Sequence, residues 1–116
     1  MEIIYQKDEF FQKFEELIDK NGITIDRPKG TAHPRFPDFI YKINYGSINN
    51  TKSQDGGGID IFEGTENRGV VGFICTIDSL KNDSEVKVLY NCSEDEIKTA
   101  VIMLSRGYMR CVLVLR

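Results

Sequence analysis

Apolar residues recur at helical spacing over residues 7–20, and Asn21-Gly22 follows as a stop signal. The spacing predicts an amphipathic helix that turns its aromatic side to the core. That side carries Phe10, Phe11, Phe14, Leu17 and Ile18. A second helix is predicted from Ser93, because Ser93 and Glu96 have the spacing of a capping box and apolar residues follow as far as Gly107.

Between and after the two helices, the apolar pattern is that of β-strands. Residues 27–38 interrupt it, hold all three prolines and predict an irregular loop. Five or six strands with short turns and a helix at each end predict one α+β domain over residues 1–116, with a sheet that curls into a small barrel. The expected strands are 23–26, 39–46, 59–64, 70–78, 84–91 and 109–116.

The composition is that of a globular protein of 116 residues, 28% of them charged, with a formal net charge of −3. Nucleic acid is not an expected partner, because its binders are more often basic, and no apolar run approaches the ~18 residues of a membrane span. The cysteines lie isolated in apolar contexts, which predicts reduced core thiols. An acidic N-terminus without a signal-peptide core predicts a cytoplasmic protein. The cysteines are Cys75, Cys92 and Cys111.

Four aspartates lie at the ends of adjacent predicted strands. Asp55 and Asp60 flank three glycines in "QDGGGIDIFEG", and Asp78 and Asp83 flank the turn "SLKN". Each pair spans a turn and a strand end, which can bring both carboxylates to one rim of the sheet. A Mg²⁺ site is one interpretation, since hard cations prefer carboxylate oxygens. The other is that these aspartates bond to the backbone of their own turns or face water.

Cations are concentrated in the proline-rich loop, where "DRPKGTAHPR" contains Arg27, Lys29, His33 and Arg35. Arginine and lysine are the side chains that bind phosphate, so the loop is a candidate anion site. The alternative is that these are solvated surface charges. His33 is the only histidine and lacks a second histidine or a cysteine with which to build a zinc site.

These residues occur in an ordered series of motifs. "ITIDRPKGT" resembles the "EIPKGS" that opens the first barrel strand of soluble family I inorganic pyrophosphatases, with Asp26 in place of the glutamate. "YKINYGSIN" is similar to their "YPxNYGYI", "DGGGID" to their signature "DGDPLD", and "TIDSLKNDSEVK" to the segment with two more metal-binding aspartates and a lysine. The matches keep the family's order over residues 23–89, which is more specific than any single motif.

The resemblance implies an OB-type barrel of five to six strands that holds Mg²⁺, with Mn²⁺ as the alternative. Several of these metal ions would lie around pyrophosphate or a related phosphoanhydride, and a metal-bridged water would attack phosphorus. The metal ligands implied are Asp55, Asp60, Asp78 and Asp83. The substrate-binding residues are Lys29, Arg35, Tyr45 and Lys87. Asp60 and Tyr45 would be catalytic.

The chain departs from the family pattern at the glycines. Gly57 stands where the family has its middle aspartate, which is tied to activating the attacking water, and Gly58 replaces a proline. Between Arg35 and Tyr41 there is no room for the family's hairpin, which carries another phosphate-binding arginine. Loss of a general base costs roughly 10²–10⁴-fold, so a weakened enzyme is still expected to turn over.

Two further parts of the pattern are ambiguous. Either Asp83 or Glu85 aligns with the family's last aspartate, and only the second choice puts Lys87 at the family's lysine. Asp83, Glu85 and Lys87 share one face of a strand in either alignment. The family's late Tyr-Lys pair has no clear equivalent. Its candidate stand-ins are Arg106, Tyr108 and Arg110.

Three functions therefore fit the sequence. The first is Mg²⁺-dependent hydrolysis of pyrophosphate, weakened by the missing residues. The second is a non-catalytic barrel that binds metal and phosphate ligands, and the third is an interaction domain whose acids are turn residues. The last predicted strand, 109–116, is also a candidate edge strand for pairing subunits into a homo-oligomer.

Overall fold

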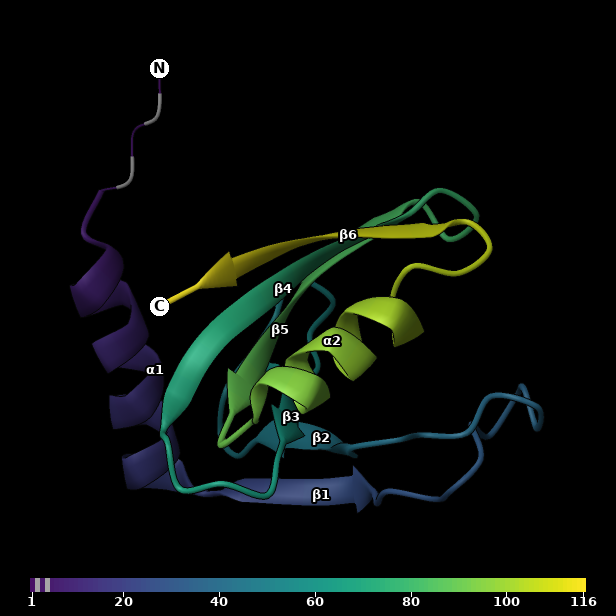
Figure 1. The fold of residues 1–116 in the computed structure, drawn as a ribbon, viewed down its shortest axis with the longest axis horizontal. Coiled ribbons are helices and arrows are strands. Elements are labelled where there is room, and N and C mark those ends of the chain that lie inside the picture. The colour runs from purple at the N-terminus through teal and green to yellow at the C-terminus, as the bar shows by residue number, and fades with distance from the viewer. Residues whose placement is uncertain (2, 4) are drawn as a thin grey trace.

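The described residues form one six-stranded sheet with two helices (Figure 1). The computed structural model describes residues 1, 3 and 5–116. Its helices are α1 (Lys7–Asn21) and α2 (Glu94–Met103). Its strands are β1 (Ile23–Arg27), β2 (Asn44–Ile48), β3 (Asp60–Glu63), β4 (Val70–Asp78), β5 (Asp83–Tyr90) and β6 (Met109–Leu115). The predicted α+β class, with six strands, is confirmed.

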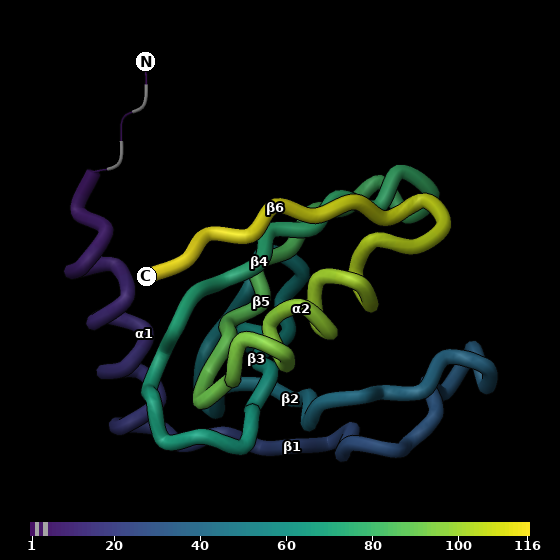
Figure 2. Tube along the Cα trace, in the orientation of Figure 1, coloured from purple at the N-terminus to yellow at the C-terminus, as the bar shows by residue number. Residues whose placement is uncertain are grey.

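The strand order is β1-β2-β3-β5-β4-β6, and every neighbouring pair is antiparallel except β3 and β5. In the described part of the chain no ladder joins β1 to β6, so the sheet is open where a closed barrel was expected. Figures 1 and 2 show why it still encloses a core: the sheet curves strongly, and α2 lies in the hollow between its two ends. The helix thereby covers apolar surface that further strand pairing would otherwise cover.

Each helix covers a different face of the sheet. The aromatic stripe of α1 packs on the outer face, with Phe11 fully buried against a cluster that includes Ile61 and Val88. On the inner face α2 packs through Ile97 and Ala100 against another cluster around the middle strands. That inner cluster includes Phe62, Ile74 and Leu89.

The predicted capping box of α2 is confirmed. The backbone N–H of Glu96 donates to Ser93 Oγ at 3.2 Å, and the backbone N–H of Ser93 donates to Glu96 Oε1 at 2.9 Å. The same Glu96 carboxylate also accepts from the Thr65 N–H at 3.1 Å. It therefore fixes the start of α2 against the segment that follows β3, and with it the position of α2 in the hollow.

A long loop separates β1 from β2. The predicted strand 39–46 is wrong in its first half, since β2 begins at Asn44. Residues 28–43 instead form an irregular excursion held by hydrogen bonds such as Tyr41 N–H to the Thr31 carbonyl (2.9 Å) and Gly30 N–H to the Tyr41 carbonyl (2.7 Å). Prolines within this segment lack the N–H that a regular ladder needs, which explains why strand pairing stops there.

The three cysteines are free thiols, as predicted. Cys92 is fully buried in the inner core, whereas Cys75 and Cys111 are half-buried. The prediction of three core thiols therefore holds strictly for Cys92 alone.

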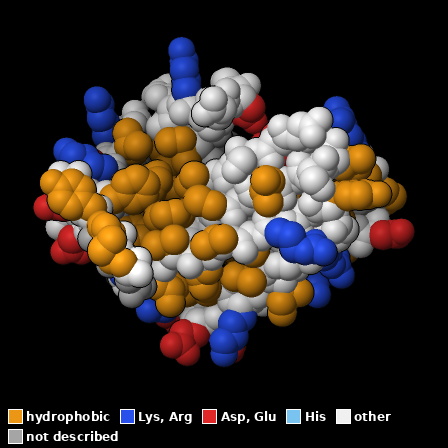
Figure 3. Space-filling view, turned by 90° about the horizontal axis from the view of Figure 1, so that it is seen from above, with side chains coloured by type: hydrophobic (Ala, Val, Ile, Leu, Met, Phe, Trp, Pro, Cys, Tyr) orange, Lys and Arg blue, Asp and Glu red, His pale blue; other side chains and the backbone are white. Residues whose placement is uncertain are grey.

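The outer face is not fully covered by α1. Figure 3 shows apolar side chains gathered on the side of the molecule seen from above, where β6 lies in Figure 1. Exposed apolar residues of α1, β4 and β6 on this face include Phe10, Ile77 and Val112. In the described part of the chain, neither helix has the length and apolar character that crossing a membrane requires.

Candidate functional site

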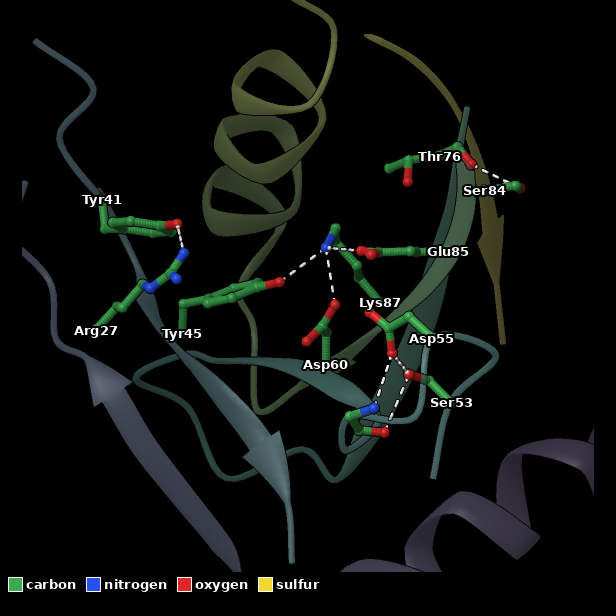
Figure 4. Close-up of polar contacts among 11 residues, drawn as sticks. Arg27, Tyr41, Tyr45, Ser53, Asp55, Asp60, Thr76, Ser84, Glu85 and Lys87 are labelled. Carbon is green, nitrogen blue, oxygen red and sulfur yellow. Dashed lines mark hydrogen bonds and ion pairs between the residues drawn. The ribbon is translucent and has the colours of Figure 1, made fainter. Parts of the chain in front are cut away.

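A buried ammonium group is the centre of the polar region on the inner face. The Lys87 side chain is only 7% exposed. Its Nζ donates to Tyr45 Oη at 2.7 Å, to Asp60 Oδ2 at 2.9 Å and to Glu85 Oε2 at 2.9 Å (Figure 4). An ammonium has three protons, so these three oxygens satisfy it completely. We call Tyr45, Asp60, Glu85 and Lys87 the lysine cluster.

Strand register brings the lysine cluster together. Asp60 of β3 lies opposite Lys87 of β5 in the parallel pair, and Ser47 of β2 lies opposite Asp60 on the other side. Glu85 precedes Lys87 by two positions and therefore projects from the same face. Tyr45 precedes Ser47 by two and reaches the ammonium from β2. Three strands thus contribute to one site.

Close approach between β1 and β2 depends on Gly46, next to Tyr45. A Cβ at this position would lie 1.8 Å from the Thr24 carbonyl oxygen of β1, which is an impossible contact. The glycine after Tyr45 therefore keeps β1 against β2 and fixes the strand from which the tyrosine projects. This gives the "NYG" of the sequence a structural reason.

Burial decides the protonation of the tyrosine and the lysine. Burial raises the pKa of Tyr45 well above its usual value of 10.0, so the hydroxyl keeps its proton. Burial by itself would lower the pKa of Lys87, but the opposite charge of Asp60 and the hydrogen bonds to Tyr45 and Glu85 raise it above 10.5 overall. Since Tyr45 stays neutral near pH 7, we attribute the charge pairing of Lys87 to the two carboxylates. The ammonium is therefore a permanent positive charge.

The two carboxylates that share this ammonium have opposite shifts. Burial, reinforced by the negative charge of Glu85, raises the pKa of Asp60 despite the nearby Lys87. Burial also acts to raise the pKa of Glu85, but the hydrogen bond and charge of Lys87 lower it overall. Environments that push two carboxyl pKa values apart are typical of acid–base sites. Asp60 is thus the member of the pair that takes up a proton more readily.

Asp55, which the resemblance implies as a metal ligand, is held in its own turn. Its carboxylate accepts hydrogen bonds from Ser53 Oγ and from the Gly57 N–H at 2.9 Å, which lower its pKa. Gly56, in the same turn, has φ of 89°, a conformation that favours glycine. The residue is fully exposed, yet it lies beside the lysine cluster (Figure 4), where its charge weakly opposes the lowering of the Glu85 pKa by Lys87.

Asp78 and Asp83 lie at the far end of the β4–β5 hairpin and are opposite each other in the ladder. Asp78 is buried, and its Oδ1 accepts from the backbone N–H groups of Leu80 at 3.0 Å and Lys81 at 3.2 Å. Asp83 is exposed. Of the four aspartates implied as ligands, the structure brings only Asp60 into the lysine cluster. Asp78 caps the hairpin turn.

The implied phosphate-binding residues are distributed differently. Tyr45 and Lys87 belong to the lysine cluster, whereas Lys29 and Arg35 are exposed in the loop after β1. The Lys29 backbone N–H donates to Asn44 Oδ1 at 2.8 Å, and the Arg35 backbone N–H donates to His33 Nδ1 at 3.0 Å. Lys29 and Arg35 add positive charge to this loop, which begins directly after Arg27, the last residue of β1.

Arg27 joins the loop to the lysine cluster. Its guanidinium donates to the Tyr41 hydroxyl and lies 5.5 Å from the Tyr41 ring centroid and 6.0 Å from that of Tyr45. Figure 4 shows Tyr45 between Lys87 on one side and the pair Arg27 and Tyr41 on the other. The loop next to these residues also has positive charge around it. The pKa of His33 is lowered first by burial and then by the charges of Arg27, Lys81 and Arg35.

Sequence reasoning left Glu85 open as an alternative to Asp83 and did not select Tyr41 as a site residue. The signal for Glu85 was present, because strand alternation places it on the face of Lys87 in either alignment. Tyr41 gave no signal in a segment expected to be a regular strand. Only the fold of the loop turns its hydroxyl to Arg27.

The fit of the site to Mg²⁺ depends on two carboxylates. Among residues 1, 3 and 5–116, no three His, Cys, Asp or Glu side chains are grouped so as to hold a metal ion. Magnesium, however, often uses one or two carboxylates together with waters and substrate phosphates. Asp60 and Glu85 face one ammonium, so with both ionised the lysine cluster has an excess of one negative charge. Donor type and charge therefore fit a magnesium ion that the substrate helps to hold.

Comparisons of the chain with protein-family models, with curated proteins and with solved structures found no match. The likeness to pyrophosphatases thus depends on the motifs of residues 23–89 and on the chemistry of the site.

Proposed function

We propose that the protein is a Mg²⁺-dependent hydrolase of pyrophosphate or a related phosphoanhydride. The observation that carries this proposal is the lysine cluster: a permanently charged, buried lysine and two carboxylates of divergent pKa, adjacent to a cationic loop. Two carboxylates suit a divalent cation, and the cations at the loop suit the anion that this metal would accompany.

In this proposal Asp60 and Glu85 hold Mg²⁺, with Asp55 at the rim as the next carboxylate. When bound, Mg²⁺ supplies charge neutralisation to the phosphate oxygens. Lys87 and Arg27 add fixed positive charge next to the phosphoryl group, where negative charge develops in the transition state. Tyr45, which keeps its proton, donates a hydrogen bond to a phosphate oxygen.

Asp60 is the proposed base, the catalytic role that the resemblance implies for it. The oxygen of a water forms the new bond to phosphorus, and its proton passes to Asp60. The bond between phosphorus and the bridging oxygen breaks, and its electron pair leaves with that oxygen. Two phosphates result from pyrophosphate. Before this step, Lys87 stabilises the two carboxylates. During the step, it stabilises the negative charge that develops on the phosphoryl group.

Three wider features belong to the same proposal. The OB-type barrel would be present in an open form, with α2 covering the gap between the sheet ends. Free thiols favour a reducing compartment such as the cytoplasm. The edge strand β6 is where a second subunit would add to the sheet.

The test is phosphate release from pyrophosphate by the purified protein, with Mg²⁺ and with EDTA in its place. The proposal predicts release in Mg²⁺ alone. If pyrophosphate with Mg²⁺ raises the melting temperature without turnover, the protein is a phosphate-ligand binder, because a ligand specific to the native state stabilises it. If neither turnover nor a shift in melting temperature occurs, the proposed function is wrong.

A further inference from the structure

A cleft lies between the loop after β1 and the end of α2. Its volume is about 340 Å³, within the range of small-molecule sites. It is lined by Arg35, Phe36, Pro37, Asp38, Phe39 and Arg106. Phe36 is 58% exposed, which is unusual for a phenylalanine, and two arginines line the cleft with it. The cleft thus offers a flat apolar surface together with positive charge.

A row of rings connects this cleft to the lysine cluster. The Phe36 and His33 centroids are 5.0 Å apart, those of His33 and Tyr41 are 6.2 Å apart with the planes at 14°, and those of Tyr41 and Tyr45 are 5.3 Å apart. The Tyr45 hydroxyl then contacts Lys87. Three ring-to-ring steps therefore separate the exposed ring from the ammonium.

Positive charge accompanies this row along its length. Arg27 lies over the rings of Tyr41 and Tyr45. Burial is the main cause that lowers the pKa of His33, and the nearby charges of Arg35 and Lys81 lower it further. Arg106 faces the cleft from the end of α2. Asp38 is the single acid in the cleft lining. Bare pyrophosphate, a small and purely ionic molecule, has no use for an aromatic surface at the outer end of such a path.

We propose that the substrate is a nucleoside di- or triphosphate, with its base stacked on Phe36 between Arg35 and Arg106 and its phosphates directed past Arg27 toward the lysine cluster. Stacking on an aromatic ring is favourable for every base, and arginine binds phosphate with directed N–H donors. This inference rests on the proposed function and names its substrate class. The bond broken is the terminal phosphoanhydride, and the products are phosphate and the nucleotide shortened by one phosphate.

The test compares two non-hydrolysable ligands that share a P–C–P group. One is methylene-bridged ATP, and the other is methylenediphosphonate, which lacks the nucleoside. Isothermal titration in Mg²⁺ measures the dissociation constant of each for wild type, for Phe36→Ala and for Phe10→Ala. Phe10 is a matched control because it is also exposed but lies on α1.

We expect wild type to prefer the nucleotide analogue at least about tenfold, and Phe36→Ala to reduce that preference at least about fivefold, the lower end of base stacking. Phe10→Ala should keep it. Equal affinity of wild type for both ligands, or an unaltered preference in Phe36→Ala, overturns the inference while leaving the phosphoanhydride proposal intact. Failure of both ligands to bind overturns the proposed function as well. Preferential binding without phosphate release from ATP supports the nucleotide site and contradicts the hydrolase.

Discussion

The acids of the two turns differ from the acids of the central strands in what holds their carboxylates. In the turns, Asp55 and Asp78 accept hydrogen bonds from backbone N–H groups two or three residues further along the chain. In the strands, Asp60 and Glu85 face the side chain of Lys87, which is far from Asp60 in sequence. The backbone N–H groups of the turns need only an oxygen that accepts a hydrogen bond, whereas the ammonium of Lys87 needs a negative charge.

This difference separates local structure from candidate chemistry. An aspartate next to a glycine-rich turn has a partner within its own turn, so its presence alone says little about a ligand. Two carboxylates on one ammonium require a folded sheet, and burying such a group costs free energy. The strand acids are therefore the stronger evidence for function, and amide substitutions distinguish the two groups, because asparagine keeps the acceptor oxygen and loses the charge.

The largest expected effect is on stability, from Lys87→Met. Removing the ammonium leaves Asp60 and Glu85 facing each other without compensation, which should lower the free energy of unfolding by about 3–5 kcal/mol. Urea denaturation measures it. The double variant Lys87→Met/Asp60→Asn should regain part of the loss, since one of the two charges is then gone. A loss below about 1 kcal/mol in Lys87→Met would contradict a buried, charge-paired lysine.

The next effect is a fall in stability at alkaline pH. The unfolded chain releases the protons of Tyr45 and Lys87 near 10.0 and 10.5, whereas the folded protein, with both pKa values raised, keeps them. Above pH 10 the unfolded state then binds fewer protons, so each group lowers the free energy of unfolding by about 1.4 kcal/mol per pH unit. Urea denaturation between pH 9 and 11 should show a shallower decline for Tyr45→Phe. Parallel curves for wild type and Tyr45→Phe would show that the tyrosine is not shifted.

Gly57→Asp tests the turn beside the lysine cluster. A Cβ at Gly57 has ordinary contact distance, 3.4 Å, to Asp55 Oδ1, so the turn accepts a side chain. The substitution places an aspartate where the pyrophosphatase pattern has one, and we expect Mg²⁺-dependent phosphate release to increase at least about tenfold, since a positioned general base typically contributes about 10²–10⁴-fold. Gln12→Asp, at an exposed position of α1, is the control. No gain over Gln12→Asp would count against the resemblance at this turn.

The smallest effect is expected where a turn acid becomes an amide. Asp78→Asn should change the free energy of unfolding by less than about 0.5 kcal/mol, because the amide oxygen still accepts from Leu80 and Lys81. Asp78→Ala removes the acceptor of both N–H groups and should cost about 0.5–1.5 kcal/mol, the usual net contribution of such a hydrogen bond. Thermal or urea unfolding of the two variants gives the comparison. Equal losses in both would show that the charge of Asp78 matters.

Local pattern was sufficient to predict both helices, the capping box at Ser93 and five of the six strands, because spacing and caps are properties of neighbouring residues. The other strand, β2, was placed too early in the chain. It was also sufficient to place Asp83, Glu85 and Lys87 on one face. It was not sufficient to pair β3 with β5, which join residues far apart in sequence and thereby bring Asp60 to Lys87. The open sheet was missed because closure depends on where α2 packs.

The most direct test of the central claim uses the matched variants Asp60→Asn and Asp78→Asn. The measurement is the initial rate of Mg²⁺-dependent phosphate release from pyrophosphate, on proteins shown to be folded. The account predicts that Asp60→Asn loses at least about 100-fold in rate while Asp78→Asn stays within about twofold of wild type. A folded Asp60→Asn with the wild-type rate would contradict it, because the lysine cluster would then not be the site of the reaction.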